Sequence, residues 1–382
     1  MPETQCTLPT YTINDILPPE TLGSIFEEHA RLEWSAPAID GQVCRLWRQI
    51  TLGSPRVWTY LEVKNRARPS MGKLRAWLCR SGAAPLHIRV HDDFTFDEHI
   101  NMTTLYDLLG GYHTRISSLR MFSGKLSFFD RRAFPCMRHL VVSDWAWSGT
   151  PSPAFQWGLM PQLQSLHLGS LDFSITPLEG GFSLKALSLY RANCISLPQH
   201  SQSLTTLMLM SISLEGIIAG PVVFPLLTYL SLFHVTGLKS YISTPCLTTY
   251  HEGGSALQDN FSTPLQSLVE YGVYCQKLIG PYPTKWNHDF PNLSRLSIWS
   301  HPLILISLLK CLADDPQLLP MLQIISISGA KLTGDEKQLM YRHVRVRREA
   351  SHVDTRLYFE MARPFRIISV FANVIIHLAN DS

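Results

Sequence analysis

A short apolar phrase, Leu-x-x-Leu-x-Leu or a close variant, recurs through most of this 382-residue chain. The clearest copies end at Leu168, Leu189, Leu209, Leu232 and Ile298, as in MPQLQSLHL, SQSLTTLML and FPNLSRLSI. From Leu140 onward, the middle apolar residues of successive copies are 26, 21, 20 and 23 residues apart. A chain with this pattern is constrained to stack one short unit on the next, because no single unit can bury its own apolar side chains.

Each phrase predicts a short β-strand at its end. The last two apolar residues alternate to one face of the strand, and the first enters the core just before it. The apolar edge that one unit leaves exposed is then covered by the next unit. Weaker copies lie near Leu119, Leu140, Tyr250, Leu268 and Ile325. We therefore expect about ten parallel strands in one stacked sheet.

The spacing and the phrase resemble those of leucine-rich repeats, whose period is 20–29 residues. The Asn that usually follows the strand in such repeats is mostly missing, although Asn193 lies near that place. The resemblance is therefore divergent and predicts irregular turns. It implies an α/β fold in which a parallel β solenoid, or horseshoe, forms most of the chain.

Residues 64–121 are expected to form the first turn of the solenoid. Met71–Ser81 has the pattern of a helix, with Leu74, Trp77 and Leu78 on one face and Gly82 at its end. Strands are predicted at 85–90 and 115–121, and a second helix at 97–109.

The chain after the last copy of the phrase is less repetitive. Asp335–Arg348 is predicted to be helical, and the final 28 residues to form a strand and a capping helix. The apolar stretch 367–379 needs burial, and it is too short for the ~20 residues of a membrane-spanning helix.

The N-terminal segment has a different pattern, which predicts three short helices. Pro18 and Pro19 suit a helix start, and Asp15 is a candidate cap. The first helix carries apolar residues at helical spacing: Leu22, Ile25, Phe26 and Ala30. The second begins at Pro37 and carries Ile39, Val43, Leu46, Trp47 and Ile50. The third is a short turn from Ser54-Pro55 with Val57, Trp58 and Leu61.

Three helices this short cannot bury two tryptophans and an Ile-Phe pair among themselves. Two interpretations stay open from the pattern alone. Either the surplus apolar surface binds a partner protein, or the segment is the helical cap of the domain that follows it.

The same segment resembles an F-box, and most closely the F-box-like proteins of mushroom-forming fungi. The resemblance covers about 50 residues: Leu17-Pro18-Pro19-Glu20, Leu22, Ile25-Phe26, Ala36-Pro37, Val43-Cys44-Arg45-Leu46-Trp47-Arg48, Ser54-Pro55-Arg56-Val57-Trp58 and Leu61. LRAWLCRSGAAPLHIRV resembles the segment that follows the F-box in those proteins. Gly23 departs from the family, since a better helix former is usual there, and costs about 1 kcal/mol against Ala.

The resemblance implies an adaptor role in protein ubiquitylation. A helical F-box-like domain (12–63) would dock on the S-phase kinase-associated adaptor of an SCF-type cullin-RING ubiquitin ligase. A repeat domain (64–382) would bind an unknown target protein. The residues implied for adaptor binding are Leu17, Pro18, Glu20, Ile25, Phe26, Val43 and Trp47. Residues just after strands are the candidates for target binding: Tyr190, Arg191, Phe233, His234, Trp299 and His301.

Two other functions are weighed against this one. The chain can be an interaction scaffold that shares the repeats but never joins a ligase. It can also be a hydrolytic enzyme whose catalytic groups come from distant parts of the chain, which a sequence motif does not reveal. No phosphate-binding loop, GxSxG elbow or HExxH pair is present, so we expect no catalytic residue.

Two polar clusters are candidate sites with simpler explanations. HDDFTFDEH contains His91, Asp92, Asp93, Asp97, Glu98 and His99, which suit a metal or acid–base site. A polar loop before a helix start explains them better. Arg342, Arg345 and Arg348 at helical spacing suit an acidic partner or a phosphate, and a solvated helix face explains them better.

Composition narrows the class of protein. A net charge of +3 spread over the chain does not indicate a nucleic-acid binder. The eight cysteines form no CxxC pair, and the N-terminus lacks the pattern of a signal peptide. We expect a cytoplasmic or nuclear protein with no cofactor, no bound metal and no membrane contact.

Overall fold

The structure is a computed structural model that describes residues 13–64, 71–91, 102–121, 126–129, 132–143, 159–169, 184–191, 201–212, 221–235, 238–254, 265–275, 289–300, 302–315, 317–328, 332–351 and 353–359. The fold is mixed α/β, with a long parallel sheet of thirteen strands. By packing, the chain forms a first unit (1–142 and 159–162) and a second unit (143–158 and 163–382). The domain boundary predicted between residues 63 and 64 lies inside the first unit. It separates the proposed adaptor-binding segment from the proposed target-binding segment, and it stays a prediction.

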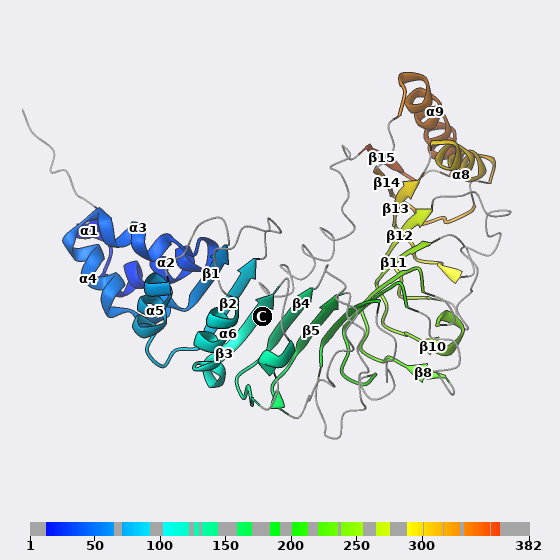
Figure 1. The fold of residues 1–382 in the computed structure, drawn as a ribbon. Helices are drawn as coiled ribbons and strands as arrows, with labels where there is room; N and C mark the ends of the chain where they lie inside the picture. The colour runs from blue at the N-terminus through cyan, green and yellow to red at the C-terminus, as the bar shows by residue number, and fades with distance from the viewer. Residues whose placement is uncertain are drawn as a thin grey trace, which may run out of the picture. The chain divides into compact units, whose positions relative to one another are not determined.

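The helical segment belongs to the first unit (Figure 1). It consists of α1 (Ile13–Ile16), α2 (Pro19–Leu32), α3 (Ala36–Val43), α4 (Arg45–Gly53) and the 3-10 turn η1 (Pro55–Trp58). The prolines lie in the first turns of α2, α3 and η1, where a missing amide hydrogen leaves no bond unmade.

The prediction of three helices missed α1 and was wrong in two further places. The helix predicted to run from Pro37 through Ile50 is broken at Cys44, which has extended backbone angles (φ −155°, ψ 175°). The Cys44 thiol caps α4 by accepting a hydrogen bond from the Trp47 amide at 3.5 Å. Leu61 lies in a strand rather than in the third helical turn.

The first four strands also belong to the first unit. Its elements are β1 (Tyr60–Lys64), α5 (Met71–Arg80), β2 (Leu86–His91), α6 (Met102–Gly110), η3 (His113–Arg115), β3 (Ile116–Met121), η4 (Leu126–Phe129) and β4 (His139–Ser143). β1 to β4 pair in parallel in chain order. The helix predicted at 71–81 and the strands predicted at 85–90 and 115–121 are confirmed. Of the helix predicted at 97–109, residues 97–101 lie outside the described residues.

The core of the first unit joins the helical segment to α5. Trp58 is buried, and its ring packs edge-on against Trp77 at 4.8 Å between ring centroids. The Arg80 guanidinium lies 4.6 Å from the Trp58 ring. Gly82 ends this region in the left-handed backbone conformation (φ +54°) that suits glycine after a helix. Trp58 is therefore buried against α5, as expected if the helical segment is a cap on the domain that follows it.

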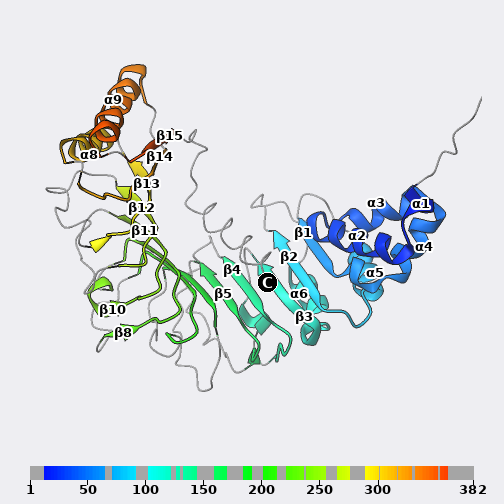
Figure 2. The same cartoon turned by 180° about the vertical axis from the view of Figure 1, so that it is seen from behind.

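The second unit contains the rest of the parallel sheet (Figure 2). Its strands are β5 (Ser165–Gly169), β6 (Ala186–Tyr190), β7 (Thr206–Met210), β9 (Tyr229–Phe233), β11 (Thr249–Gly254), β12 (Glu270–Cys275), β13 (Arg295–Ser300), β14 (Ile324–Ser328) and β15 (Arg356–Phe359). β8 (Val222–Val223) and β10 (Ile242–Ser243) form a separate two-stranded sheet. Every copy of the apolar phrase ends in a strand, as predicted, and chain order equals sheet order, as in a solenoid.

The register aligns the repeated leucines into two buried rows on the core face of the sheet. One row continues through the middle apolar residue of each copy: Leu166, Leu187, Leu207, Leu230, Tyr250, Tyr271, Leu296 and Ile325. The other row follows two residues later: Leu168, Leu189, Leu209, Leu232, Glu252, Val273, Ile298 and Ile327. The buried rows are apolar except at β11 and β12.

The turns after the strands are more regular than the missing asparagines predicted. Arg191, Ser211 and His234 each follow a strand and each have a positive φ of 52–54°. The amide of each donates a hydrogen bond to a carbonyl oxygen at the end of the next strand in the sheet. The acceptors are Met210 for Arg191, at 2.9 Å, and Phe233 for Ser211 and Gly253 for His234, both at 2.7 Å. Three successive repeats therefore share one left-handed turn without the residue type that usually forms it.

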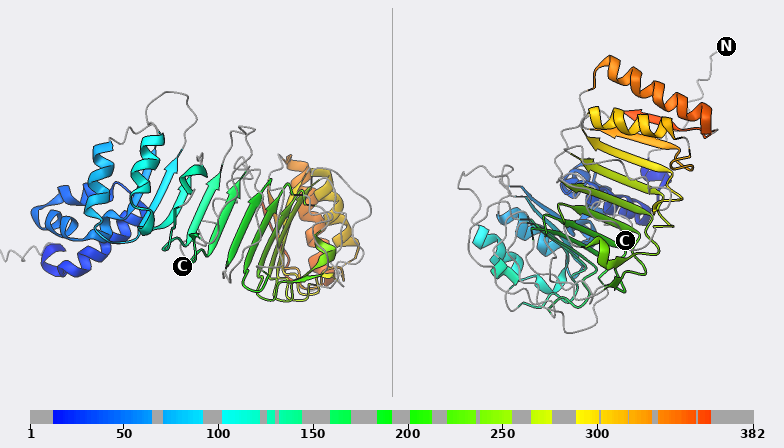
Figure 3. Two further views of the ribbon diagram at one scale, coloured as in Figure 1. Left: turned by 60° about the horizontal axis from the view of Figure 1, so that its bottom comes forward. Right: turned by 90° about the vertical axis from the view of Figure 1, so that its right-hand side faces the viewer.

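Two helices pack beside the last strands of the second unit. These are α8 (Pro302–Asp314), which was not predicted, and α9 (Gly334–Ser351), which confirms the predicted helix at 335–348. They lie side by side (Figure 3). Thr333 and Glu336 form a capping box at the start of α9, with the Thr333 amide 2.8 Å from Glu336 Oε2. Of the predicted C-terminal strand and capping helix, β15 is present and residues 360–382 lie outside the described residues.

Two glycines are required where neighbouring rings lie flat on the sheet. A Cβ on Gly253 would be 2.3 Å from Phe233 Cδ1, and one on Gly272 would be 2.7 Å from His251 Cδ2. We expect Gly253→Ala to lower the free energy of unfolding by about 1–3 kcal/mol, because the ring of Phe233 must move off the strand. Calorimetry measures this, with Gly334→Ala as the control because a Cβ there meets nothing within 4 Å. Equal melting temperatures for the two variants would contradict it.

Candidate functional site

The helices α2 and α4 pack through an aromatic pair. Phe26 is buried, with 1% of its surface exposed, and its ring centroid lies 4.8 Å from that of Trp47. Leu22 and Ala30 are buried on the same side of α2. His29 joins α2 to α3, with its Nδ1 3.1 Å from the buried Asp40 carboxylate. The segment therefore has a small core of its own.

A large part of the apolar surface of this segment stays exposed. Seven large apolar side chains are exposed within residues 13–53, whereas the described residues from 54 to 222 carry none and the longer described part from 223 to 359 carries ten. The exposed fractions of the seven are 52% for Ile13, 65% for Ile16, 46% for Ile25, 76% for Leu32, 51% for Ile39, 59% for Val43 and 50% for Leu52. We call these seven side chains the exposed apolar set. Such a concentration indicates a surface that another molecule covers.

The residues implied for adaptor binding differ in exposure. Ile25 and Val43 belong to the exposed apolar set. Pro18 and Glu20 are exposed at the start of α2, and Leu17 and Trp47 are half-buried. Phe26 is sealed within the segment. Phe26 therefore packs against Trp47 inside the segment and offers almost no surface to a partner.

Of the exposed apolar set, the helical pattern named Ile25, Ile39 and Val43 and missed the other four: Ile13, Ile16, Leu32 and Leu52. Ile13 and Ile16 come from α1, which the pattern did not predict. Ile39 and Val43 lie on α3, which ends at the break at Cys44 instead of continuing into one longer helix. A helical period alone carries no signal for that break.

The residues expected to bind a target differ in exposure, although the register places Tyr190, Phe233 and Trp299 in one row across the sheet. Arg191 and His234 are exposed at the left-handed turns after β6 and β9, and Tyr190 and Trp299 are half-buried. Phe233 is 7% exposed because its ring lies over Gly253. His301 lies outside the described residues.

An aromatic and polar cluster lies on the outer face of β9 to β13, opposite the leucine rows. Tyr229 Oη is 3.4 Å from His251 Nδ1, and His251 Nε2 is 3.8 Å from Glu270 Oε1. The ring of His251 also faces Trp299, with 6.0 Å between ring centroids. The motif analysis did not find this cluster because its members come from four different strands.

The electrostatics of the cluster do not suit nucleophilic catalysis. Burial raises the pKa of Tyr229 to about 12, so its hydroxyl is not readily ionised near neutral pH. The His251 imidazole beside it lowers the pKa of Glu270, which is therefore a carboxylate. The group that would need activation is thus held protonated, and the cluster is better described as an aromatic platform.

Of the predicted acidic and histidine cluster, only His91 lies in the described residues. Its Nε2 is 2.6 Å from Glu62 Oε1 on the neighbouring strand. Burial lowers the pKa of His91, although the carboxylate acts in the opposite direction. Within the described ranges, no group of three or more His, Cys, Asp or Glu side chains is placed to hold a metal ion.

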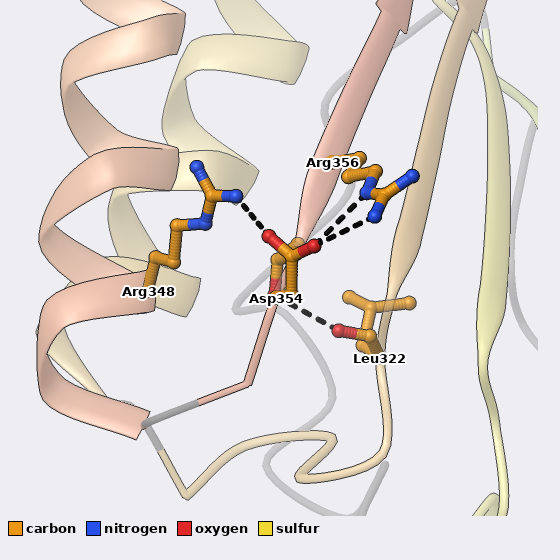
Figure 4. Close-up of polar contacts among 5 residues, drawn as sticks. Leu322, Arg348, Asp354 and Arg356 are labelled. Atoms are coloured by element: carbon orange, nitrogen blue, oxygen red, sulfur yellow. Dashed lines mark hydrogen bonds and ion pairs between the residues drawn. The ribbon is translucent and has the colours of Figure 1, made fainter.

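Two of the three arginines predicted as a possible anion site on α9 already have acidic neighbours. Arg345 Nε donates to Glu349 at 2.8 Å. Arg348 donates to Asp354, whose other oxygen accepts from Arg356 Nε and Nη2 at 3.0 and 2.9 Å (Figure 4). These two arginines lower the pKa of Asp354. The arrangement agrees with a solvated helix face.

No known family model matches this chain, and no curated protein matches its sequence. In the described part of the chain, no helix combines the length and the apolar content needed to cross a bilayer.

Proposed function

We propose that this chain is a substrate-recognition subunit of an SCF-type cullin-RING ubiquitin ligase. In this proposal the helical segment is an F-box that docks on the S-phase kinase-associated adaptor, and the repeat sheet binds the target protein. The observation that carries the proposal is the exposed apolar set on α1 to α4, the segment that also carries the half-buried Trp47. The resemblance of this segment to F-box-like proteins identifies the partner that would cover it.

The proposal assigns no chemistry to the chain itself. A receptor of this kind holds a target near the ubiquitin-conjugating subunit, which raises the local concentration of a target lysine. The target surface would be the aromatic platform on β9 to β13, together with His234 at the turn after β9 and Arg191 at the turn after β6. The target protein would be found by affinity purification from cells in which the proteasome is blocked.

Calorimetric titration of the purified adaptor into the full chain tests the docking step. Val43→Asp places a charge in the proposed interface, so we expect at least about 30-fold weaker binding, the effect of losing one strong interface contact. The combined variant Ile25→Asp with Trp47→Ala should abolish binding.

Leu303→Asp is the matched control, because Leu303 on α8 is 59% exposed, the same fraction as Val43. It should bind like the wild type. Absence of wild-type binding would favour a scaffold that never joins a ligase. Binding that survives Val43→Asp and the combined variant would contradict the proposed surface.

A further inference from the structure

Trp47 is held in place from α1, the short helix that precedes the proline pair. Its indole Nε1 donates a 2.7 Å hydrogen bond to Asn14 Oδ1, which is 33 residues away in the chain. The amide nitrogen of Asn14 lies 4.0 Å from the Cys44 thiol. One side chain therefore contacts both the break between α3 and α4 and the tryptophan in the first turn of α4.

The remaining contacts of Trp47 fix only part of its position. Phe26 packs against its ring, and its backbone amide bonds to the Cys44 thiol. A ring-to-ring contact allows sliding and tilting, whereas the indole hydrogen bond fixes the direction of the ring plane. Asn14 is thus the contact that sets which edge of Trp47 faces outward.

Three members of the exposed apolar set lie close to this contact in the chain. Ile13 and Ile16 flank Asn14 in α1, and Val43 directly precedes Cys44. A shift of α1 would therefore move Trp47 and change the apolar surface beside it at the same time. Asn14 therefore links the position of α1 to the orientation of Trp47.

We propose that Asn14 is a positioning residue for adaptor binding, acting through the orientation of Trp47. This inference rests on the proposed function. Replacing Asn14 by Leu removes the acceptor and should weaken adaptor binding about 10-fold, the effect of one lost hydrogen bond that orders an interface side chain. Asn14→Asp keeps an oxygen acceptor for the indole and should stay within about 3-fold of the wild type.

The test is a double-mutant cycle on adaptor affinity with Asn14→Leu and Trp47→Phe. Phenylalanine has no indole N–H, so in the Trp47→Phe background Asn14→Leu should change the affinity less than about 2-fold. The melting temperature of each variant is measured in parallel, and affinities are taken where every variant is folded. A purely structural role would lower the melting temperature and leave the affinity of the folded chain unchanged.

The outcomes separate this inference from the proposed function. Wild-type binding with an unchanged affinity for Asn14→Leu would overturn the inference alone, as would effects of the two substitutions that simply add. Failure of the wild type to bind the adaptor would overturn the proposed function and this inference with it. The indole N–H signal of Trp47, followed by NMR in 15N-tryptophan-labelled chain, should shift in Asn14→Leu and stay close to its place in Asn14→Asp.

Discussion

Arg347→Ala is expected to lower the free energy of unfolding of the second unit by about 2–5 kcal/mol, the range for truncating a large buried side chain. Arg347 is 1% exposed, although it lies on an otherwise polar helix. Its Nη1 donates to the carbonyl oxygens of Leu312 and Leu318 at 3.2 and 2.8 Å, and its Nη2 to that of Leu319 at 2.7 Å. The guanidinium thus donates hydrogen bonds to carbonyl oxygens at the end of α8 and in the turn after it. Its removal leaves these buried carbonyls without that donor.

Thermal unfolding followed by calorimetry measures this effect, which corresponds to roughly 10 °C for a unit of this size. Arg347→Lys should recover only part of the loss, because an ammonium cannot reach three carbonyls in the planar geometry of a guanidinium. Arg345→Ala on the same helix is the control, since Arg345 is solvent-exposed. A melting temperature that is unchanged in Arg347→Ala would show that α9 does not anchor the end of this unit.

Glu252→Ala is expected to have a loss of similar size, about 3–5 kcal/mol. Glu252 occupies a place in the buried leucine row, between Leu232 and Val273 in the register. Its carboxylate accepts hydrogen bonds from Tyr250 at 2.7 Å and from Tyr271, and it forms an ion pair with Lys239. Removing the carboxylate leaves a buried ammonium and two buried hydroxyls that must find other partners.

A variant that makes the whole cluster apolar separates the lost charge pair from lost packing. It combines Lys239→Met, Tyr250→Phe, Glu252→Leu and Tyr271→Phe. Because a buried polar network is often replaced by apolar groups at little cost, we expect this variant to be at least about 2 kcal/mol more stable than Glu252→Ala. Urea unfolding compares the two. An apolar variant no more stable than Glu252→Ala would contradict the explanation that the loss in Glu252→Ala comes from stranded polar groups.

The strands were predictable from the sequence because each repeat has leucines at the same places that need burial. Leu166, Leu187, Leu207 and Leu230 must each be buried by a neighbour, and a parallel stack is the arrangement that does so for all of them. The copy at β11 has Tyr250 and Glu252 in the leucine places, and its pattern is correspondingly weak. It still forms a strand, in which Lys239 and Tyr271, each within one repeat of Glu252 in the chain, bind the Glu252 carboxylate.

The candidate site was less predictable, since it depends on contacts between distant residues. The spacing of Ile39, Val43 and Trp47 is the same for one long helix or for two short ones, so the break at Cys44 has no signal in the period. Phe26 belongs to the motif, but its burial against Trp47 appears only when α2 and α4 are packed together. The exposure of an apolar residue cannot be derived from its type, and the exposed apolar set is what the structure adds.

Hydrogen–deuterium exchange of the full chain, alone and with saturating adaptor, tests the central claim most directly. The account predicts slower exchange of the backbone amides within residues 13–53, most of all in the short helix α1, with the strands of the second unit unchanged. Protection confined to the repeat strands, or no protection within 13–53 at adaptor concentrations that saturate binding, would contradict the claim that this helical segment is the adaptor-docking surface.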